Sequence, residues 1–401
     1  EERCHPANAA REPRRRGTEN PMSERSRSTV ALVKCSSYDR DVVDAALGRL
    51  LDLLGGMTAY VSSGEKVLLK PNLLSAKSPD RAITTHPSLL EALVARVRSA
   101  GGTVTIGDSP GGAIRGIERV WRNTGLSELS ERIGVPLVNF EASGSVELEG
   151  RLRSYMIARP AVSADAVIGV PKMKTHVLTL YTGCIKNMFG CVPGFGKGRL
   201  HQEAPRPEPF SRHVVDVYSL VAPRLHVMDA VVAMEGNGPS GGSPRHVGAL
   251  VGGADPVAVD AVVEQMMGYR AGQVPTTRVA AARGLGIADM GLIDIVGDDP
   301  AEFDVEGFEL PGTTMLNLIP GFLVRALKPW IWVCPEMSKE RGCRAEACAL
   351  CVRSCPVGAI EMTESGPVVD RATCVECLCC HEVCPEDAVE VRLSWLASKF
   401  A

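Results

Sequence analysis

The sequence predicts an α/β fold, a mostly parallel open sheet with flanking helices, followed by a small α+β domain. Two observations predict the large domain. Short apolar runs alternate with segments of helical periodicity from residue 29 onward, and turns rich in Gly, Pro, Asp and Lys follow several of these runs. A third observation, a dense group of cysteines after residue 340, predicts a separate C-terminal domain.

The elements of the large domain follow in order from these patterns. Strands are expected at the apolar runs 30–33, 66–70, 103–106, 135–140, 166–170, 225–228, 247–251 and 293–296. Helices are expected over residues 42–54, 87–97, 214–221 and 257–267. Pro87 and Pro256 suit first helical positions, with His86 and Asp255 before them as caps.

Composition divides the chain into five segments. We predict a disordered N-terminal extension (1–28), an α/β ligand-binding or catalytic domain (29–315), a linker helix (316–340), a two-cluster domain (341–392) and a C-terminal tail (393–401). The first segment is rich in Arg, Glu, Ser and Pro and has no apolar face. The linker contains charged residues and prolines, which favours an amphipathic connecting helix over a membrane span.

Bulk composition is that of an ordinary soluble protein. The 401 residues are 45% hydrophobic and 23% charged, with a net charge of -3. This balance creates no field that would recruit nucleic acid or an anionic membrane. Most of the fourteen cysteines lie in closely spaced motifs rather than in a disulfide framework, which indicates a reducing compartment and a cytoplasmic location.

The C-terminal cysteines predict two iron-sulfur clusters. Residues 374–385 read Cys-x-x-Cys-x-x-Cys-x-x-x-Cys-Pro, a run typical of bacterial ferredoxins, in which the fourth cysteine binds the neighbouring cube. An imperfect copy lies 29 residues earlier, with Ala345 in place of its first cysteine. The predicted ligands are Cys343, Cys348, Cys351 and Cys384 for the first [4Fe-4S] cube, and Cys374, Cys377, Cys380 and Cys355 for the second.

Other interpretations of these cysteines remain open. Cys343 lies two residues from the position that the repeat requires, so the alternatives for the first site are a three-iron cluster or recruitment of Cys334. Structural zinc is the other alternative, although zinc sites use two Cys-x-x-Cys pairs separated by a loop rather than repeated triplets followed by Cys-Pro. Cys379 is outside the repeat and is interpreted as a buried thiol.

Polar residues after the strands predict a pocket for an anion. Ligands of open α/β sheets bind beyond the carboxyl ends of the strands, and the segment 172–201 places several lysines and histidines after one of them. The predicted substrate-binding residues are Lys70, Asn72, Asp108, Ser109, Lys172, Asn187, Lys197 and Glu235. The catalytic candidates are Lys174 and Lys186, which would polarise the substrate, and His176, which would supply a proton.

Two alternatives apply to this pocket: a solvated basic loop for the lysines and a plain hydrogen-bonding role for His176. Nucleotide motifs are absent from the sequence. Gly-x-Gly-x-x-Gly does not occur, and residues 191–198 fail as a phosphate loop because Cys191 and Gly198 occupy required positions. No flavin or nicotinamide motif is therefore visible.

Eight segments carry a family resemblance: LLKPNLL, TTHPSLLEAL, IGDSPGG, PKMKTH, TGCIKNMFGCVPG, KGRLH, MEGNGP and GADPVAVDAV. Together, over residues 30–267, they resemble the domain-of-unknown-function family numbered 362, which is often fused to ferredoxin modules. The resemblance implies a cytoplasmic iron-sulfur protein of redox type with a ferredoxin-like two-cluster domain. It implies no substrate, and the departure at Ala345 puts full occupancy of one cluster in question.

The leading hypothesis is an iron-sulfur oxidoreductase that uses an external electron donor. An external ferredoxin or reductase would supply single electrons, and two cubes would pass them to an anionic small molecule in the α/β domain. The rival is a non-catalytic electron relay or assembly factor that docks a protein partner. A third interpretation makes the α/β domain a ligand or metal binder with structural clusters.

Overall fold

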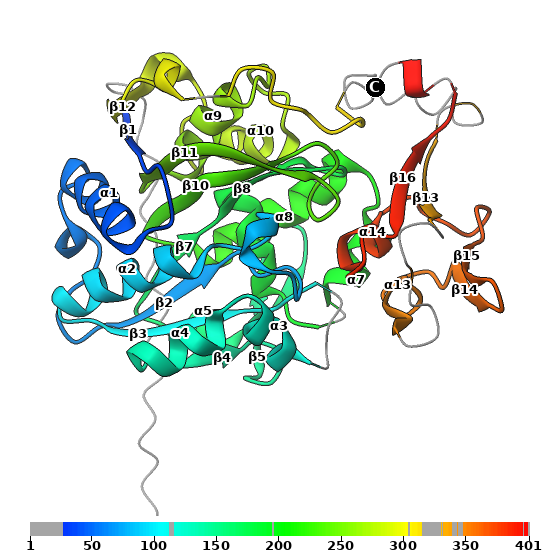
Figure 1. Ribbon diagram of the computed structural model, residues 1–401, viewed down its shortest axis with the longest axis horizontal. Helices are drawn as coiled ribbons and strands as arrows, with labels where there is room; N and C mark the ends of the chain where they lie inside the picture. The colour runs from blue at the N-terminus through cyan, green and yellow to red at the C-terminus, as the bar shows by residue number, and fades with distance from the viewer. Residues whose placement is uncertain are drawn as a thin grey trace, which may run out of the picture.

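The structure is a computed structural model that describes residues 27–111, 116–194, 196–303, 305–314, 330, 332–338, 343, 348–395 and 397–399. It consists of a large α/β domain and a small domain formed by the C-terminal cysteine-rich region (Figure 1). Nearly all of the predicted N-terminal extension, and most of the predicted linker helix, lie outside the described residues. Within the described part of the chain, no helix is long and apolar enough to cross a membrane.

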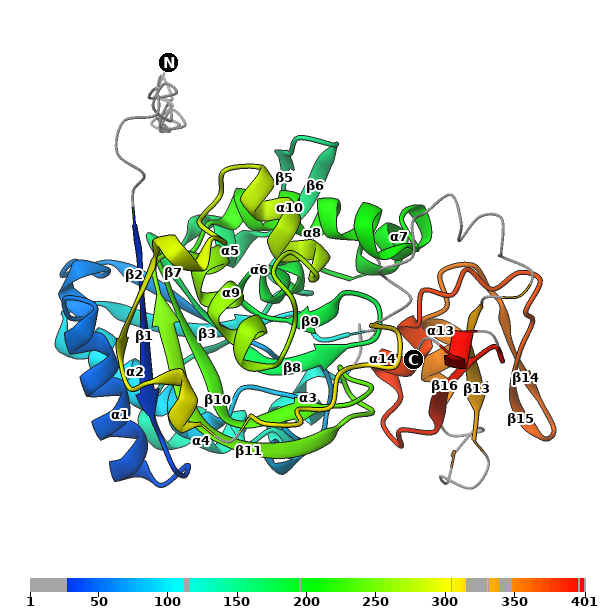
Figure 2. The same ribbon diagram turned by 90° about the horizontal axis from the view of Figure 1, so that it is seen from above.

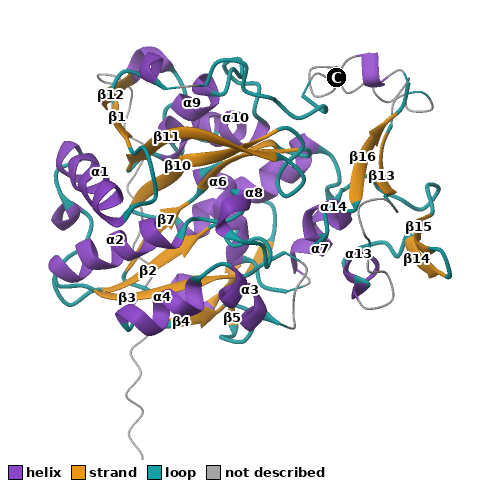
Figure 3. Ribbon diagram, in the orientation of Figure 1, coloured by secondary structure: helices purple, strands orange, loops and turns teal. Residues whose placement is uncertain are grey.

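The large domain is built on one mixed sheet (Figure 3). Its strands are β1 (Ser28–Lys34), β2 (Lys66–Pro71), β3 (Thr103–Asp108), β4 (Leu137–Asn139), β7 (Ala166–Val170), β8 (Lys172–His176), β9 (Leu180–Thr182), β10 (Leu225–Glu235), β11 (Ser243–Gly253) and β12 (Ile293–Gly297). The order is β12-β1-β11-β10-β7-β2-β3-β4, with β8 paired to β10 and β9. Six of the nine pairs between described strands of this sheet are parallel, so the predicted fold class is confirmed.

Helices cover both faces of this sheet (Figure 2). One face carries α1 (Arg40–Leu53) and α2 (Pro87–Ser99), and the other carries α8 (Pro207–Val221), α9 (Pro256–Met266) and α10 (Pro275–Ala282). The other elements of the large domain are α3 (Ile117–Asn123), α4 (Leu126–Ile133), α5 (Arg159–Ser163), α6 (Cys184–Asn187), α7 (Gly196–Glu203) and the hairpin of β5 (Ser145–Glu149) with β6 (Ser154–Ala158).

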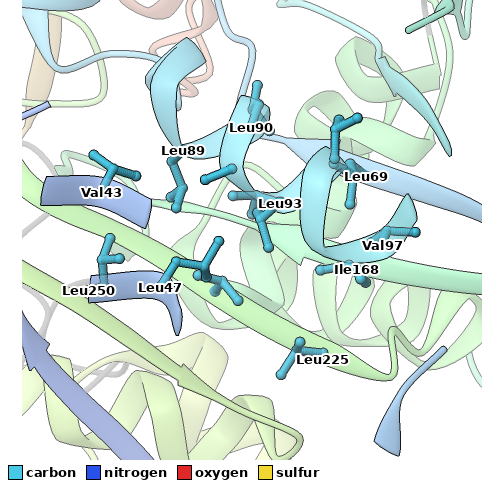
Figure 4. Close-up of a cluster of buried hydrophobic side chains, with 14 of the residues drawn as sticks. Val43, Leu47, Leu69, Leu89, Leu90, Leu93, Val97, Ile168, Leu225 and Leu250 are labelled. Carbon is cyan, nitrogen blue, oxygen red and sulfur yellow. The ribbon is translucent and has the colours of Figure 1, made fainter. Parts of the chain in front are cut away.

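The apolar periodicity of the helices builds the core. In α1 the buried positions recur every three or four residues, and Leu47 of this helix packs with Leu93 of α2 over Ile168 and Leu225 of the sheet (Figure 4). Burial of each such side chain stabilises the fold by about 1.5–3 kcal/mol.

The predicted caps are also present. Ser88 N donates to His86 Nδ1 over 3.2 Å, and Val257 N donates to Asp255 Oδ1 over 2.9 Å.

Residues 172–176 form β8 instead of a solvated basic loop. All five are buried, and the strand pairs with β10, with Lys172 opposite Asp229 and a shift of register before Lys174. Lys172 is tolerated there because Asp229 of β10 pairs with it, and Lys174 because Asn72 and the Ile83 carbonyl oxygen accept its hydrogen bonds. The loop alternative for these lysines was therefore wrong.

The small domain begins earlier than predicted. Its elements are β13 (Val333–Met337), α13 (Leu350–Arg353), β14 (Ile360–Thr363), β15 (Gly366–Val369), α14 (Cys379–Val383) and β16 (Val389–Leu393). Residues 333–337, expected in the linker helix, form a strand because they pair antiparallel with β16. Pro335 has no backbone N–H to donate, but proline is compatible with edge strands, and both strands of this sheet are edge strands.

Helix α14 joins the small domain to the large one. Ser240 Oγ donates to the carbonyl oxygens of His381 and Glu382, each over 3.2 Å, and His381 Nε2 lies 3.1 Å from the Asn237 carbonyl oxygen. Lys77 forms an ion pair of 3.0 Å with Asp387 just beyond the helix. These contacts fix one cysteine-bearing helix against the strand-end loops of the α/β domain.

Candidate functional site

A cavity of about 380 Å³ lies between the two domains. The α/β domain contributes the carboxyl ends of β2 and β3, the β8 strand and α6, and the small domain contributes α14 and the end of α13. The predicted residues that line it are Lys70, Asn72, Asp108, Ser109, Lys174, Lys186, Asn187 and Lys197. This is the edge of the sheet at which a ligand was expected.

Lys70 and Asp108 form a buried ion pair in one wall of the cavity. Their Nζ and Oδ1 atoms are 2.7 Å apart, and both side chains are almost fully buried. Lys70 also donates to the Pro71 carbonyl oxygen over 2.7 Å and to Asn187 Oδ1 over 3.2 Å. Burial raises the pKa of Asp108, and the charge of Lys70 opposes that shift.

Lys174 points into the same cavity from β8. Its Nζ donates to Asn72 Oδ1 over 2.8 Å and to the Ile83 carbonyl oxygen over 2.7 Å. Burial, followed by the charge of Lys186, lowers the pKa of Lys174 well below its usual value.

Lys186 is the cavity lysine with no hydrogen bond or ion pair to another described residue. Burial lowers its pKa, while the Glu382 carboxylate raises it. Its side chain is half-buried, so its ammonium is available to a bound anion.

Lys197 closes the wall near β3. It donates to the carbonyl oxygens of Ser109 and Pro110 over 2.7 and 2.8 Å, and it contacts Ser109 Oγ, which in turn donates to Glu141. Burial lowers the pKa of Lys197 to about 8, although Glu141 opposes the shift from 3.8 Å.

His176 lies behind the cavity wall and does not line it. Its Nδ1 accepts the Leu178 amide over 3.1 Å, so the neutral ring carries its hydrogen on Nε2. That atom lies 3.1 Å from Glu382 Oε1, although the angles at the contact are outside those of a hydrogen bond. Burial lowers the pKa of His176 to about 3, so the ring is neutral near pH 7.

Glu382 brings a carboxylate from α14 into the cavity. Burial raises its pKa, but His176 and Lys186 outweigh burial, so the pKa of Glu382 falls below its usual value. Sequence reasoning missed this residue, as it missed Glu141 and Arg353, which also line the cavity. A usable signal was present: Glu382 is the one acidic residue between Cys380 and Cys384.

Two predicted substrate-binding residues lie away from the cavity. Lys172 forms a fully buried ion pair with Asp229 over 2.9 Å and donates to the Tyr38 hydroxyl over 2.7 Å. Glu235, at the end of β10, pairs with Arg245 over 3.2 Å and accepts the Glu309 amide over 3.0 Å. Neither side chain lines the cavity, because both are engaged within the α/β domain.

The structure brings cysteines of both predicted ligand sets close together. Cys343, Cys348, Cys351 and Cys384 line one small cavity together with Met337 and Val389. In the second group, burial and then the neighbouring thiols of Cys377, Cys374, Cys351 and Cys355 raise the pKa of Cys380. Cys334, the alternative ligand for the first group, lies near Cys374 of the second instead.

Backbone amides point at several of these sulfur atoms. Ala359 N donates to Cys355 Sγ over 3.1 Å, and Ala388 N donates to Cys384 Sγ over 3.2 Å. Such hydrogen bonds favour thiolates and tune the potential of a cluster, so these cysteines fit the chemistry of iron-sulfur ligands. Among the described residues, no three His, Cys, Asp or Glu side chains are close enough to hold a single metal ion.

Comparison with known proteins decides the family. Residues 67–264 match the sequence profile of the domain of unknown function DUF362. A thylakoid-associated protein of Synechocystis sp. is 34% identical over 290 residues, which cover 72% of this chain and 89% of that protein. The chain belongs to the DUF362 family. The family resemblance of the eight sequence segments is thus confirmed.

Shorter matches concern iron-sulfur proteins. One component of an ion-translocating oxidoreductase complex of Methanosarcina acetivorans is 40% identical over 53 residues, which cover 13% of this chain and 19% of that component. A ferredoxin of Methanothermococcus thermolithotrophicus is 37% identical over 51 residues, which cover 12% of this chain and 85% of the ferredoxin. With the cysteine-rich C-terminal region, these matches identify a ferredoxin-like domain in this DUF362 protein.

Among solved structures, the lactate racemase apoprotein of Thermoanaerobacterium thermosaccharolyticum matches with a TM-score of 0.40 and 13% identity. The match covers 61% of this chain and 57% of that one.

Proposed function

We propose that this DUF362 protein is an iron-sulfur reductase that acts on an anionic small molecule in the cavity between its two domains. One observation carries the proposal: Cys355, a predicted ligand of the second cube, lines the same cavity as Lys174 and Lys186. A substrate in that cavity would lie next to a cluster ligand, where single electrons can reach it.

Two [4Fe-4S] cubes are the proposed cofactors. Cys343, Cys348, Cys351 and Cys384 would hold the first, and Cys374, Cys377, Cys380 and Cys355 would hold the second. When bound, the cubes supply low-potential electrons one at a time. Because the four thiolates of each cube need a reducing compartment, we keep a cytoplasmic location as part of the proposal.

The charges of the cavity support an anionic substrate. Among the described lining residues, the basic ones are Lys70, Lys174, Lys186, Lys197, Arg199 and Arg353, and the acidic ones are Asp108, Glu141 and Glu382. Lys70 is neutralised by Asp108, whereas Lys186 has no such partner in the described part of the chain. A carboxylate or phosphate that pairs with Lys186 would also have its charge stabilised as the molecule is reduced.

His176 has a positioning role in this proposal. Because it does not line the cavity, it acts through Glu382, whose carboxylate it contacts from behind. Asn187 likewise orients Lys70, since its Oδ1 accepts from that lysine and its Nδ2 donates to the Lys70 carbonyl oxygen over 3.0 Å.

An external ferredoxin or reductase would supply the electrons. Exposed apolar side chains on the β14–β15 hairpin support docking of this donor there. Met362 is 39% exposed and Val368 is 49% exposed. The rival function, a relay without its own substrate, would use this surface but has no need of the lysine-lined cavity.

The test follows the oxidation of reduced, anaerobically purified protein by small anionic acceptors, through its visible absorbance. We expect Lys186→Met to slow oxidation by anions and Lys66→Met to leave it unchanged. Lys66 is the matched control because it is exposed at the opposite end of the strand that carries Lys70. Equal rates for the wild type and Lys186→Met would refute the cavity as the substrate site.

A further inference from the structure

We propose that Lys174 is the nucleophile of the cavity, and that it captures an anionic aldehyde or ketone as an imine. The inference rests on the proposed function, because that function places the substrate in this cavity. It narrows the class of substrate to acids that carry an aldehyde or ketone group. It gives Lys174 a covalent role in place of the polarising role inferred from the sequence.

The hydrogen-bond partners of the buried lysines separate Lys174 from the others. Lys70 has three acceptors, one of them the Asp108 carboxylate, and Lys172 pairs with the Asp229 carboxylate. Both therefore have the surroundings of an ammonium group. Lys174 has two neutral acceptors, Asn72 Oδ1 and the Ile83 carbonyl oxygen, and among the described residues no carboxylate lies within ion-pair distance of it.

Two acceptors match the two hydrogens of a neutral amine. The side chain is 1% exposed, so a third hydrogen and a full positive charge would be costly at this position without a carboxylate partner. In the neutral form, the lone pair of Nζ has no protein donor in the described part of the chain. Since Lys174 lines the cavity, that lone pair is available to a bound molecule.

The surrounding charges favour the neutral amine. The groups that act on Lys174 are Lys186 of α6 and Lys172 of β8, which disfavour its ammonium form, and Glu382 of α14 and Asp108 of β3, which favour it. Burial is the largest cause and acts in the same direction as the two lysines, so the pKa of Lys174 is lowered. A neighbouring cation of this kind is a known means of activating a lysine as a nucleophile.

The chemistry balances without an oxidant or reductant. The amine nitrogen attacks the carbonyl carbon, the C–N bond becomes C=N, and the carbonyl oxygen leaves as water with both amine hydrogens. Lys186 would pair with the carboxylate or phosphate of the same molecule. Because reduction of the C=N bond would leave an amine that hydrolysis cannot release, turnover requires the electrons to enter another bond, such as a carbon–carbon double bond conjugated with the imine.

The test uses the full chain, purified anaerobically, with pyruvate as the probe and cyanoborohydride to trap an imine. Peptide mapping by mass spectrometry locates the adduct. We expect it on Lys174, absent from Lys174→Gln, whose neutral amide keeps two donors but forms no imine, and unchanged in Lys66→Met. Acetone, which lacks the carboxylate, should label Lys174 less than pyruvate does.

The dependence on pH gives a second readout. Lys186→Met removes a positive charge beside Lys174, so the pKa of Lys174 rises and the neutral amine is reached only at higher pH. With acetone, which has no carboxylate for Lys186 to bind, the pH dependence of labelling should therefore shift to higher pH in that variant. An unchanged pH dependence would contradict activation of Lys174 by the charge of Lys186.

Label spread over exposed lysines without enrichment at Lys174 would overturn the proposal, and equal labelling by acetone and pyruvate would overturn its anionic part. Trapping requires no electrons from the clusters, so this outcome is separate from that of the reductase test. An adduct on Lys174 without electron transfer to any acceptor would refute the reductase alone.

Discussion

The buried Lys70–Asp108 pair gives the sharpest prediction about stability. Asp108→Asn removes the carboxylate but keeps the size of the side chain, so it leaves the Lys70 ammonium in a position that is 1% exposed. Removing one partner of a buried ion pair costs about 3–5 kcal/mol, because the remaining charge is desolvated and uncompensated. Against a typical free energy of unfolding of about 5–15 kcal/mol, this is a large part of the total.

Urea denaturation of the wild type and the variant, followed by circular dichroism under anaerobic conditions, measures this cost. The control is Lys34→Met, which breaks an ion pair with Glu302 in which both side chains are about half exposed, with an expected change of about 0–1 kcal/mol. In the double variant Lys70→Met/Asp108→Asn no charge is left unpaired, so its cost should be smaller than the sum of the single variants by about 1–3 kcal/mol. A cost for Asp108→Asn as small as that of the control, or strict additivity, would refute the reasoning.

Three further predictions concern the clusters, the cavity and the cap of α9. Cys380→Ser should lower the iron content from about eight to about four per chain, whereas Cys379→Ser should leave it at about eight; equal losses would contradict the ligand assignment. Since the pKa of Lys197 is about 8, its positive charge is lost as pH rises through that value, and oxalate binding measured by calorimetry should weaken above pH 8 and show no such step in Lys197→Met. Asp255→Ala removes the acceptor of two amides at the start of α9 and should cost about 1 kcal/mol in urea denaturation, with an unchanged midpoint counting against the cap.

The strands and helices could be predicted in part because apolar runs and helical periodicity indicate burial locally. The expected run 166–170 coincides with β7, and the cap at Asp255 is as the sequence indicates. The strand β8 was missed because its lysines, threonine and histidine resemble a polar loop, and only pairing with β10 shows that they are buried. The strand β13 was missed for the same reason, since its partner β16 lies about fifty residues later.

The site could be predicted as a group of residues but not as a set of roles. Lys172 and Lys174 lie two residues apart on one strand, yet one is enclosed in an ion pair and the other lines the cavity. No local pattern separates them, because the difference depends on Asp229 of another strand. The role of Glu382 could not be predicted from a local pattern either, because this residue contacts His176 from a different domain.

The central claim is that one cube lies beside a cavity that binds anions. Electron paramagnetic resonance of the reduced protein, with and without oxalate, tests it most directly. We predict that oxalate alters the signal of the second cube and leaves that of the first unchanged, and that Lys186→Met removes the effect while Lys66→Met retains it. Iron-free protein, or signals of both cubes that do not respond although calorimetry detects bound oxalate, would contradict the claim.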